Sequence, residues 1–267
     1  MLLSRILRAW SLGALCLLTI AGVSADAAET VSGLSLRASG RHRPIVIRHI
    51  REGAASSLNW SGYAVTGPKG SVQDVWGSWT VPSVKCDSGT EYSSFWVGID
   101  GFNSSTVEQI GTDADCRTGS PAYYAWFEFY PHPMFTINRL SVNPGDHMSA
   151  HVQYAQRQFT VTITNDTTGQ SFSTSTRVNS AQRSSAEWVA EAPSSAGGIL
   201  PLADFVTVSY SGDTAMVNDA TGAIGAFGTA NVYQIAMVDS SGNPKAVPSM
   251  LGSDNSSFSV QWVSAGP

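Results

Sequence analysis

Hydrophobic and polar residues alternate in three segments between residues 93 and 131, which read SSFWVGIDG, TVEQIGTD and YYAWFEFYP. Successive side chains of a β-strand point to opposite faces of its sheet. The alternation therefore predicts three strands, each with an apolar face and a face of acids, amides and large aromatic rings. In the first strand Trp96, Gly98 and Asp100 share this second face.

The other two segments extend the polar and aromatic surface. Gln109 and Asp113 share a face in the second segment. In the third segment, four residues lie opposite the apolar Ala125, Phe127 and Phe129: Tyr124, Trp126, Glu128 and Tyr130. Because a buried carboxylate is costly without partners, such a surface is typical of a polymer-binding cleft. The alternative is an ordinary sandwich whose core these aromatic rings fill.

From Asn59 to the C-terminus, short strand-like runs are separated by turn residues, and no helical periodicity is visible. Examples are VQDVWGSWTVP, HMSAHVQYA, FTVTITN and SFSVQWVS. This spacing predicts an all-β fold, an antiparallel β-sandwich or jelly roll. We expect a dozen or more strands in two stacked sheets, with no internal repeat and no second domain boundary.

The first 57 residues differ from the rest in composition. Residues 1–25 resemble a secretory signal peptide, with Arg5 and Arg8 before an apolar run that is too short to span a membrane comfortably. Residues 26–57 are rich in Arg, whereas residues 58–267 contain 8 Lys and Arg against 17 Asp and Glu, a net charge of −9. A basic leader before an acidic domain suggests a propeptide that pairs with the acidic cleft; a disordered tail without a role is the alternative.

Composition narrows the function further. The chain is 42% hydrophobic and only 13% charged, with 25 Gly and 12 Pro, which suits one large all-β domain or two small ones. Its acidic balance argues against nucleic-acid binding. Outside the signal segment only Cys86 and Cys116 remain, and in an oxidising compartment we expect them to form a disulfide. A metal pair is the alternative, but other ligands at useful spacing are lacking.

The remaining candidate chemistry rests on carboxylates. No GxSxG, HExxH or glycine-rich phosphate loop is present. Glu187 and Glu191 share a strand face, but they stand about 13 Å apart at about 3.3 Å per residue. The two carboxyls of a glycosidase lie about 5 to 9.5 Å apart, so this pair alone is unsuitable. Glu191 with Glu128 from another strand could satisfy the distance.

Five motifs, taken together, resemble the glutamic peptidases, also called eqolisins. They are NWSGYAV at 59–65, FWVGIDG at 95–101, EQIGTD at 108–113, AWFEFYP at 125–131 and AEWVAE at 186–191. They occur in the order and approximate spacing of that family, and the resemblance covers most of residues 58–267. It implies a curved, concanavalin- or jelly-roll-like sandwich of two seven-stranded antiparallel sheets, and a secreted, pepstatin-insensitive acid endopeptidase.

The resemblance also implies the site residues. The family's catalytic glutamine falls on Gln109 and its catalytic glutamate on Glu191. Its cleft residues carry over to seven positions, which coincide with the faces deduced from alternation: Trp60, Trp96, Asp100, Asp113, Trp126, Glu128 and Tyr130. Tyr124 departs from the pattern, because fungal members have an acidic residue there. This departure leaves substrate preference and pH optimum open.

A Gln–Glu pair suits peptide hydrolysis, which needs a base, an oxyanion donor and an acid. We expect ionised Glu191 to activate water and then to protonate the leaving nitrogen, while the Gln109 amide donates to the oxyanion. An ordinary glutamate titrates near about 4.3 and is a poor proton donor at neutral pH, so we expect activity in acid.

The expected partners are protein or peptide substrates, with no nucleic acid, no membrane after signal removal and no metal or organic cofactor; a monomer suffices. Two other functions stay open, a carbohydrate-binding sandwich and a glycoside hydrolase that uses Glu128 and Glu191.

Overall fold

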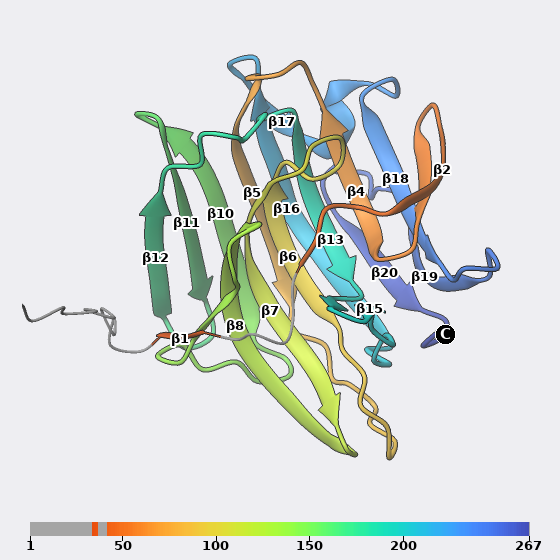
Figure 1. Cartoon of the computed structure of the whole chain (residues 1–267). Helices are drawn as coiled ribbons and strands as arrows, with labels where there is room; N and C mark the ends of the chain where they lie inside the picture. The colour runs from red at the N-terminus through yellow and green to blue at the C-terminus, as the bar shows by residue number, and fades with distance from the viewer. Residues whose placement is uncertain (1–33, 37–41, 267) are drawn as a thin grey trace, which may run out of the picture. The chain divides into compact units, whose positions relative to one another are not determined.

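Two antiparallel sheets lie face to face in the part of the chain that the computed structural model describes, residues 34–36 and 42–266 (Figure 1). The first sheet contains, in spatial order, β9 (Phe135–Ile137), β8 (Ser120–Tyr130), β7 (Val107–Arg117), β6 (Ser94–Ile99), β13 (Ser185–Glu191), β4 (Trp60–Thr66) and β18 (Val232–Val238). The second contains β12 (Gln170–Thr176), β11 (Gln158–Asn165), β10 (His147–Ala155), β5 (Val72–Thr80), β16 (Thr207–Val217), β20 (Phe258–Trp262) and β19 (Pro244–Pro248). The prediction of two roughly seven-stranded antiparallel sheets is confirmed.

Shorter elements complete the two sheets. The sheets join at one edge, where β18 pairs with β19. The other elements are β1 (Leu34–Leu36) beside β9, β2 (Ile47–Arg51) beside β3 (Ala54–Ser57), β17 (Ala220–Ala223) beside β16, the hairpin of β14 (Ser194–Ser195) and β15 (Gly198–Ile199), and a 3-10 helix at Ile224–Phe227. Across the described residues, no helix is long and apolar enough to cross a membrane. The predicted signal segment, residues 1–25, lies outside the described part of the chain.

The hydrophobic core lies between the sheets and confirms the faces predicted from alternation. Val97 and Phe127 of the first sheet pack in one cluster with Val75 and Val152 of the second. Burying one such side chain contributes about 1.5–3 kcal/mol. The aromatic residues on alternate positions, among them Trp96, belong to a second cluster on the opposite face of the first sheet. This sheet is therefore buried on both faces.

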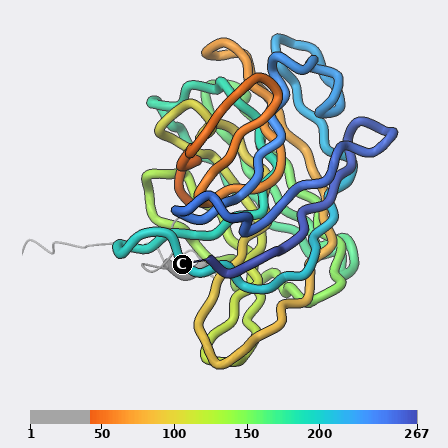
Figure 2. Tube along the Cα trace, turned by 90° about the vertical axis from the view of Figure 1, so that its right-hand side faces the viewer, coloured from red at the N-terminus to blue at the C-terminus, as the bar shows by residue number. Residues whose placement is uncertain are grey.

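The leader segment, residues 26–57, contains three strands that its sequence did not indicate: β1, which pairs with β9, and the hairpin of β2 and β3. β3 runs parallel to β18, with Ala54 opposite Gln234, and β2 folds back antiparallel on β3. Figure 2 shows this orange hairpin in front, beside the blue β18. All five residues of β2 are exposed, so it needs no apolar face and shows no alternation. The end of the basic leader is thus part of the first sheet.

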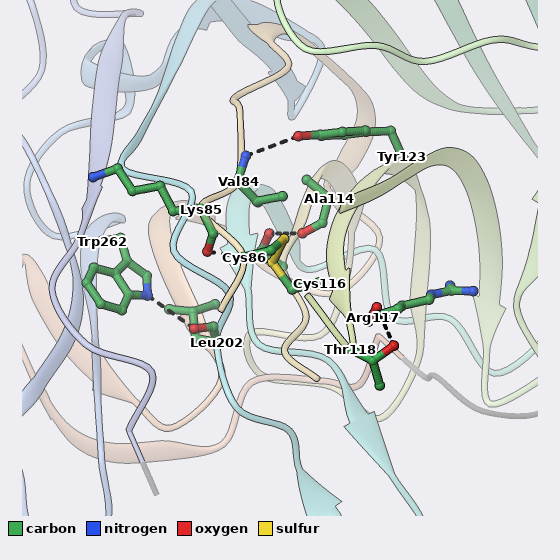
Figure 3. The surroundings of a disulfide bond; sticks show 11 residues. Val84, Lys85, Cys86, Ala114, Cys116, Arg117, Thr118, Tyr123, Leu202 and Trp262 are labelled. Carbon is green, nitrogen blue, oxygen red and sulfur yellow. Dashed lines mark hydrogen bonds between the residues drawn. A yellow bond between two sulfur atoms is a disulfide. The ribbon is translucent and has the colours of Figure 1, made fainter. Parts of the chain in front are cut away.

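The predicted disulfide is confirmed between Cys86 and Cys116, whose Cα atoms lie 5.3 Å apart (Figure 3). Cys116 is on β7, and Cys86 belongs to the segment between β5 and β6. The Tyr123 hydroxyl accepts a hydrogen bond from the Val84 amide at 3.1 Å, which ties the same segment to β8. The disulfide anchors this long connection beside the strand that carries Gln109.

Removing the disulfide should destabilise the protein. The two cysteines are 30 residues apart in sequence, and closing a loop of this size contributes roughly 2–4 kcal/mol. We expect Cys86→Ser with Cys116→Ser to lower the free energy of unfolding by this amount, as measured by urea denaturation. Wild-type protein in reductant should match the double variant, and the variant should not respond to reductant. An unchanged unfolding midpoint after full reduction would contradict the expectation.

Candidate active site

Five adjacent strands of the first sheet bring most of the predicted site residues to one face. The strand pairings align three rows across β4, β13, β6, β7 and β8. The first row is Trp60, Glu191, Ser94, Asp113 and Tyr124. The second row is Gly62, Val189, Trp96, Gly111 and Trp126. The third row is Ala64, Glu187, Gly98, Gln109 and Glu128. Members of successive rows are two residues apart on every strand, so all three rows share one face.

Glycine in the middle row makes room for the large rings. A Cβ atom on Gly111 would lie 2.3 Å from the carbonyl oxygen of Phe95 and 2.5 Å from the Cβ atom of Trp96. Trp96 also meets Trp60 edge to face, with ring centroids 4.9 Å apart. The indoles are therefore packed side by side, and they form the floor between Glu191 and Gln109.

Glu191 is completely buried on this floor. The indole Nε1 of Trp96 donates a hydrogen bond to Glu191 Oε2 at 2.9 Å, and Glu191 Oε1 has no hydrogen-bond partner. Burial raises the pKa of Glu191 well above its ordinary value, and the neighbouring Glu128 and Asp113 add to the increase. The Trp96 hydrogen bond acts in the opposite direction, because it favours the ionised carboxylate.

Gln109 approaches from β7 and is also completely buried. Its amide Nε2 donates to the backbone carbonyl oxygen of His42 at 2.6 Å. Its Oε1 has no hydrogen-bond partner. The amide is therefore oriented with its donor on a peptide carbonyl.

His42 occupies the space between these two side chains, and the sequence did not indicate this position. Its imidazole stacks on Trp126 with ring centroids 3.6 Å apart and an interplanar angle of 11°. Nδ1 lies 3.3 Å from Glu191 Oε2, and the backbone N–H donates to Glu128 Oε2 at 2.8 Å. Burial lowers the pKa of His42 to about 3. One residue of the leader thus contacts Gln109, Glu191, Trp126 and Glu128.

The described part of the leader contacts Glu191, Gln109 and Glu128 through His42. We expected arginines of residues 26–57 to pair with cleft carboxylates. Among the residues described, Arg43, Arg48 and Arg51 make no ion pair. The imidazole of His42, whose pKa is lowered to about 3, contacts Glu191 as a neutral ring. Arg37 and Arg41 lie outside the described residues.

Tyr124, the departure from the family pattern, lies between two carboxyls. Its hydroxyl is 2.7 Å from Asp113 Oδ2 and 2.9 Å from Asp115 Oδ2. Burial raises the pKa of Asp113 well above its ordinary value, and the nearby Asp115 contributes. A phenol has one proton, so a proton on one of the carboxyls would satisfy both contacts. Tyr124 therefore adds a hydroxyl donor beside Asp113 and Asp115, where Arg117 also pairs with Asp115 at 3.2 Å.

Asp100 and Tyr130 lie at the ends of their strands, outside the three rows. The carboxylate of Asp100 accepts hydrogen bonds from the backbone N–H groups of Gln182, Arg183 and Ser184 at 2.7 to 2.9 Å. This carboxylate holds the loop of residues 182–184. Its expected role in substrate binding stays a prediction. Tyr130 is half-buried at the end of β8 and packs against the aromatic cluster.

The described residues contain no group of three or more His, Cys, Asp or Glu that could hold a metal ion. The side chains on this face carry carboxyl, amide, indole and imidazole groups.

Comparison with known proteins shows which class of protein has this sandwich and its acidic, aromatic face. Residues 58–262 match the Peptidase A4 family, and the chain belongs to that family. It is a peptidase, and the resemblance to the glutamic peptidases is confirmed. Aspergillopepsin-2 of Aspergillus niger is 30% identical over 196 residues, which cover 62% of this chain and 69% of the relative.

Solved structures agree with the fold. Scytalido-glutamic peptidase with a transition state analog inhibitor aligns with a TM-score of 0.66 at 23% identity, covering 77% of this chain and 98% of that one. Aspergilloglutamic peptidase from Aspergillus niger aligns with a TM-score of 0.57 at 25% identity, covering 65% of this chain and 99% of that one.

Proposed function

We propose that this chain is a secreted acid endopeptidase, made as a zymogen, that hydrolyses peptide bonds with Gln109 and Glu191. One observation carries the proposal: both side chains, from strands far apart in sequence, contact the same residue of a bound peptide segment. Each also keeps one buried oxygen without a hydrogen-bond partner, where a water molecule could bind. Secretion rests on the signal-like sequence of residues 1–25.

The proposed reaction needs Glu191 as a base and then as an acid. Ionised Glu191 removes a proton from water, the water oxygen bonds to the scissile carbonyl carbon, and the Gln109 amide donates to the oxyanion. The protonated Glu191 then gives its proton to the departing nitrogen. Burial is the largest cause of the raised pKa of Glu191 while His42 covers it. Removal of His42 would admit water and favour the ionised form through the Trp96 hydrogen bond.

The remaining residues of the face suit an extended substrate. Trp60, Trp96 and Trp126 supply flat apolar surface, and Glu128 accepts a backbone N–H from the segment already bound there. An extended chain that crosses a sheet face can use its backbone groups for affinity and its side chains for specificity. Protein and peptide substrates are therefore favoured over the sugar polymers considered from sequence alone.

Replacement of Gln109 tests the function together with the substrate class. We expect acid-treated wild type to digest denatured casein between about pH 2 and 5 in the presence of pepstatin. Gln109→Ala should reduce kcat by roughly 10²–10³, the effect of losing one oxyanion donor. Reducing-sugar release from a panel of glycans is the control assay, and we expect none. Glycan hydrolysis without casein cleavage would contradict the proposal.

A further inference from the structure

The segment that begins at His42 is held on the catalytic face through its backbone. The carbonyl oxygen of Arg43 accepts hydrogen bonds from Trp60 Nε1 at 3.0 Å and from Asn59 Nδ2 at 3.4 Å. Further along, the Ile45 N–H donates to the Gly101 carbonyl at 3.1 Å, and the Val46 N–H donates to Asn59 Oδ1 at 2.7 Å. With the Glu128 contact of His42, residues 42–46 are bound as a peptide substrate would be.

Within this segment, the carbonyl of His42 has the contacts of a scissile group. It receives the Gln109 amide, whereas the Arg43 carbonyl receives groups outside the proposed dyad. Glu191 lies on the imidazole side of the same residue, and its Oε1 remains without a hydrogen-bond partner. Water at Oε1 would be a base-bound nucleophile beside a carbonyl that already has its oxyanion donor.

The residues around the peptide bond between His42 and Arg43 favour a position of its carbonyl group beside Gln109 and Glu191. The His42 ring is enclosed by the face of Trp126, by Met134 Sδ at 3.1 Å and by Asp113 Oδ1 at 3.9 Å. On the other side of the bond, Pro44 restricts Arg43 to extended conformations, which suit a chain lying across a sheet face. The side-chain pocket therefore accepts a flat imidazole immediately before the bond, and the backbone is extended immediately after it.

We propose that the peptide bond between His42 and Arg43 is a self-cleavage site, which the chain hydrolyses in its own cleft. The inference rests on the proposed function and deepens it by naming its first substrate, a histidyl–arginyl bond. Water adds across the bond: its oxygen joins the His42 carbonyl carbon, and Glu191 transfers the water proton to the Arg43 nitrogen as the C–N bond breaks. The products are a His42 carboxylate and an Arg43 ammonium group, with no oxidation or cofactor.

Cleavage at this bond would open the site without disturbing the sheet. Residues after Arg43 stay attached through Asn59 and through the pairing of β2 with β3. The new terminus at His42 can leave the Trp126 face, which uncovers Glu191 and Gln109 on that side of the cut bond, while residues 43–46 keep their hydrogen bonds. Until then the same residue blocks both groups, so the uncleaved chain is its own inhibitor.

Acid treatment of the full chain tests the assignment. Protein purified at neutral pH is brought to the pH at which it digests casein, and products are followed by intact mass and N-terminal sequencing. We expect a new N-terminus at Arg43, formed with a half-life that does not change over a hundredfold dilution. A mature N-terminus elsewhere with the His42–Arg43 bond intact, or a half-life that lengthens with dilution, would overturn the proposal.

Variants separate this proposal from the proposed function. His42→Ala removes the ring from the Trp126 pocket and should slow cleavage of this bond by roughly tenfold or more. His49→Ala is the matched control, because His49 is exposed on β2, and we expect the wild-type rate. Casein digestion by a chain whose own bond survives would overturn self-cleavage alone. A chain inert toward both casein and itself would overturn both proposals.

Discussion

Replacement of Glu191 by glutamine should abolish peptide hydrolysis while the fold persists. The substitution keeps the shape of the side chain, and the glutamine carbonyl can still accept the Trp96 indole hydrogen bond. It removes the base that activates water and the acid that protonates the leaving nitrogen. General acid–base catalysis contributes roughly 10²–10⁴ for each proton transfer, so we expect kcat to fall at least by that factor. Initial rates on a quenched peptide substrate after acid treatment measure the loss.

Glu187→Gln is the matched control for this experiment. Glu187 is on the same strand and the same face as Glu191, four residues earlier, and it is equally buried. The ionisable groups that act on Glu187 are Asp100 and Glu108. Among the described contacts, the His42 imidazole lies against Glu191 and not against Glu187. We expect its activity to stay within a few-fold of wild type. Equal loss in both variants would indicate structural damage and would contradict the specific role of Glu191.

Much of this face could be predicted because strand alternation is a local property. Parity alone placed Trp96 on one face and Phe95 on the other, and the two belong to different clusters. The rows across the sheet are not local, since Trp60 and Glu191 pair across more than a hundred residues. The spacing of residues within one strand does not predict which residues of two strands pair. The five ordered motifs supplied the missing information through resemblance.

His42 shows why the leader could not be interpreted in the same way. Residues 40–44 read GRHRP, without alternation, and the charge of the segment suggested arginine contacts. The position of His42 depends instead on partners contributed by β7, β8 and β13. The available signal was Pro44, which favours an extended residue before it. A segment that binds as a substrate carries little sequence signature of its own, because its geometry comes from the cleft.

The second large effect that we expect is loss of stability as the pH rises. Burial raises the pKa values of Glu108, Glu187 and Asp213 well above their ordinary values. Within the described part of the chain, none of the three forms an ion pair. The protonated forms therefore suit the folded state, and folding must hold these protons more tightly than the unfolded chain does.

The sign of the effect follows from this difference. Below the unfolded pKa values, about 4.3 for Glu and 3.9 for Asp, both states are protonated and the full stability is present. As the pH rises through the higher folded pKa values, the unfolded state loses its protons first and stability falls. Each pKa unit of difference is worth about 1.4 kcal/mol per carboxyl, against about 5–15 kcal/mol for a whole domain. Three such groups therefore lower the free energy of unfolding together as the pH rises.

Thermal unfolding from pH 3 to 8, followed by circular dichroism, measures this loss. The Glu191→Gln background prevents self-digestion during the scan. We expect the highest Tm near pH 3 to 4 and a steep fall above it, and the fall should become shallower when Glu108→Gln, Glu187→Gln and Asp213→Asn are combined. Asp239→Asn is the control: hydrogen bonds, the largest from Asn243, lower the pKa of Asp239, so its stabilisation persists at high pH. The Asp239→Asn variant should keep the steep fall of Tm. Buried neutral carboxyls cannot ionise without cost, so a wild-type Tm that rises from pH 4 to 8 would contradict the expected loss of stability.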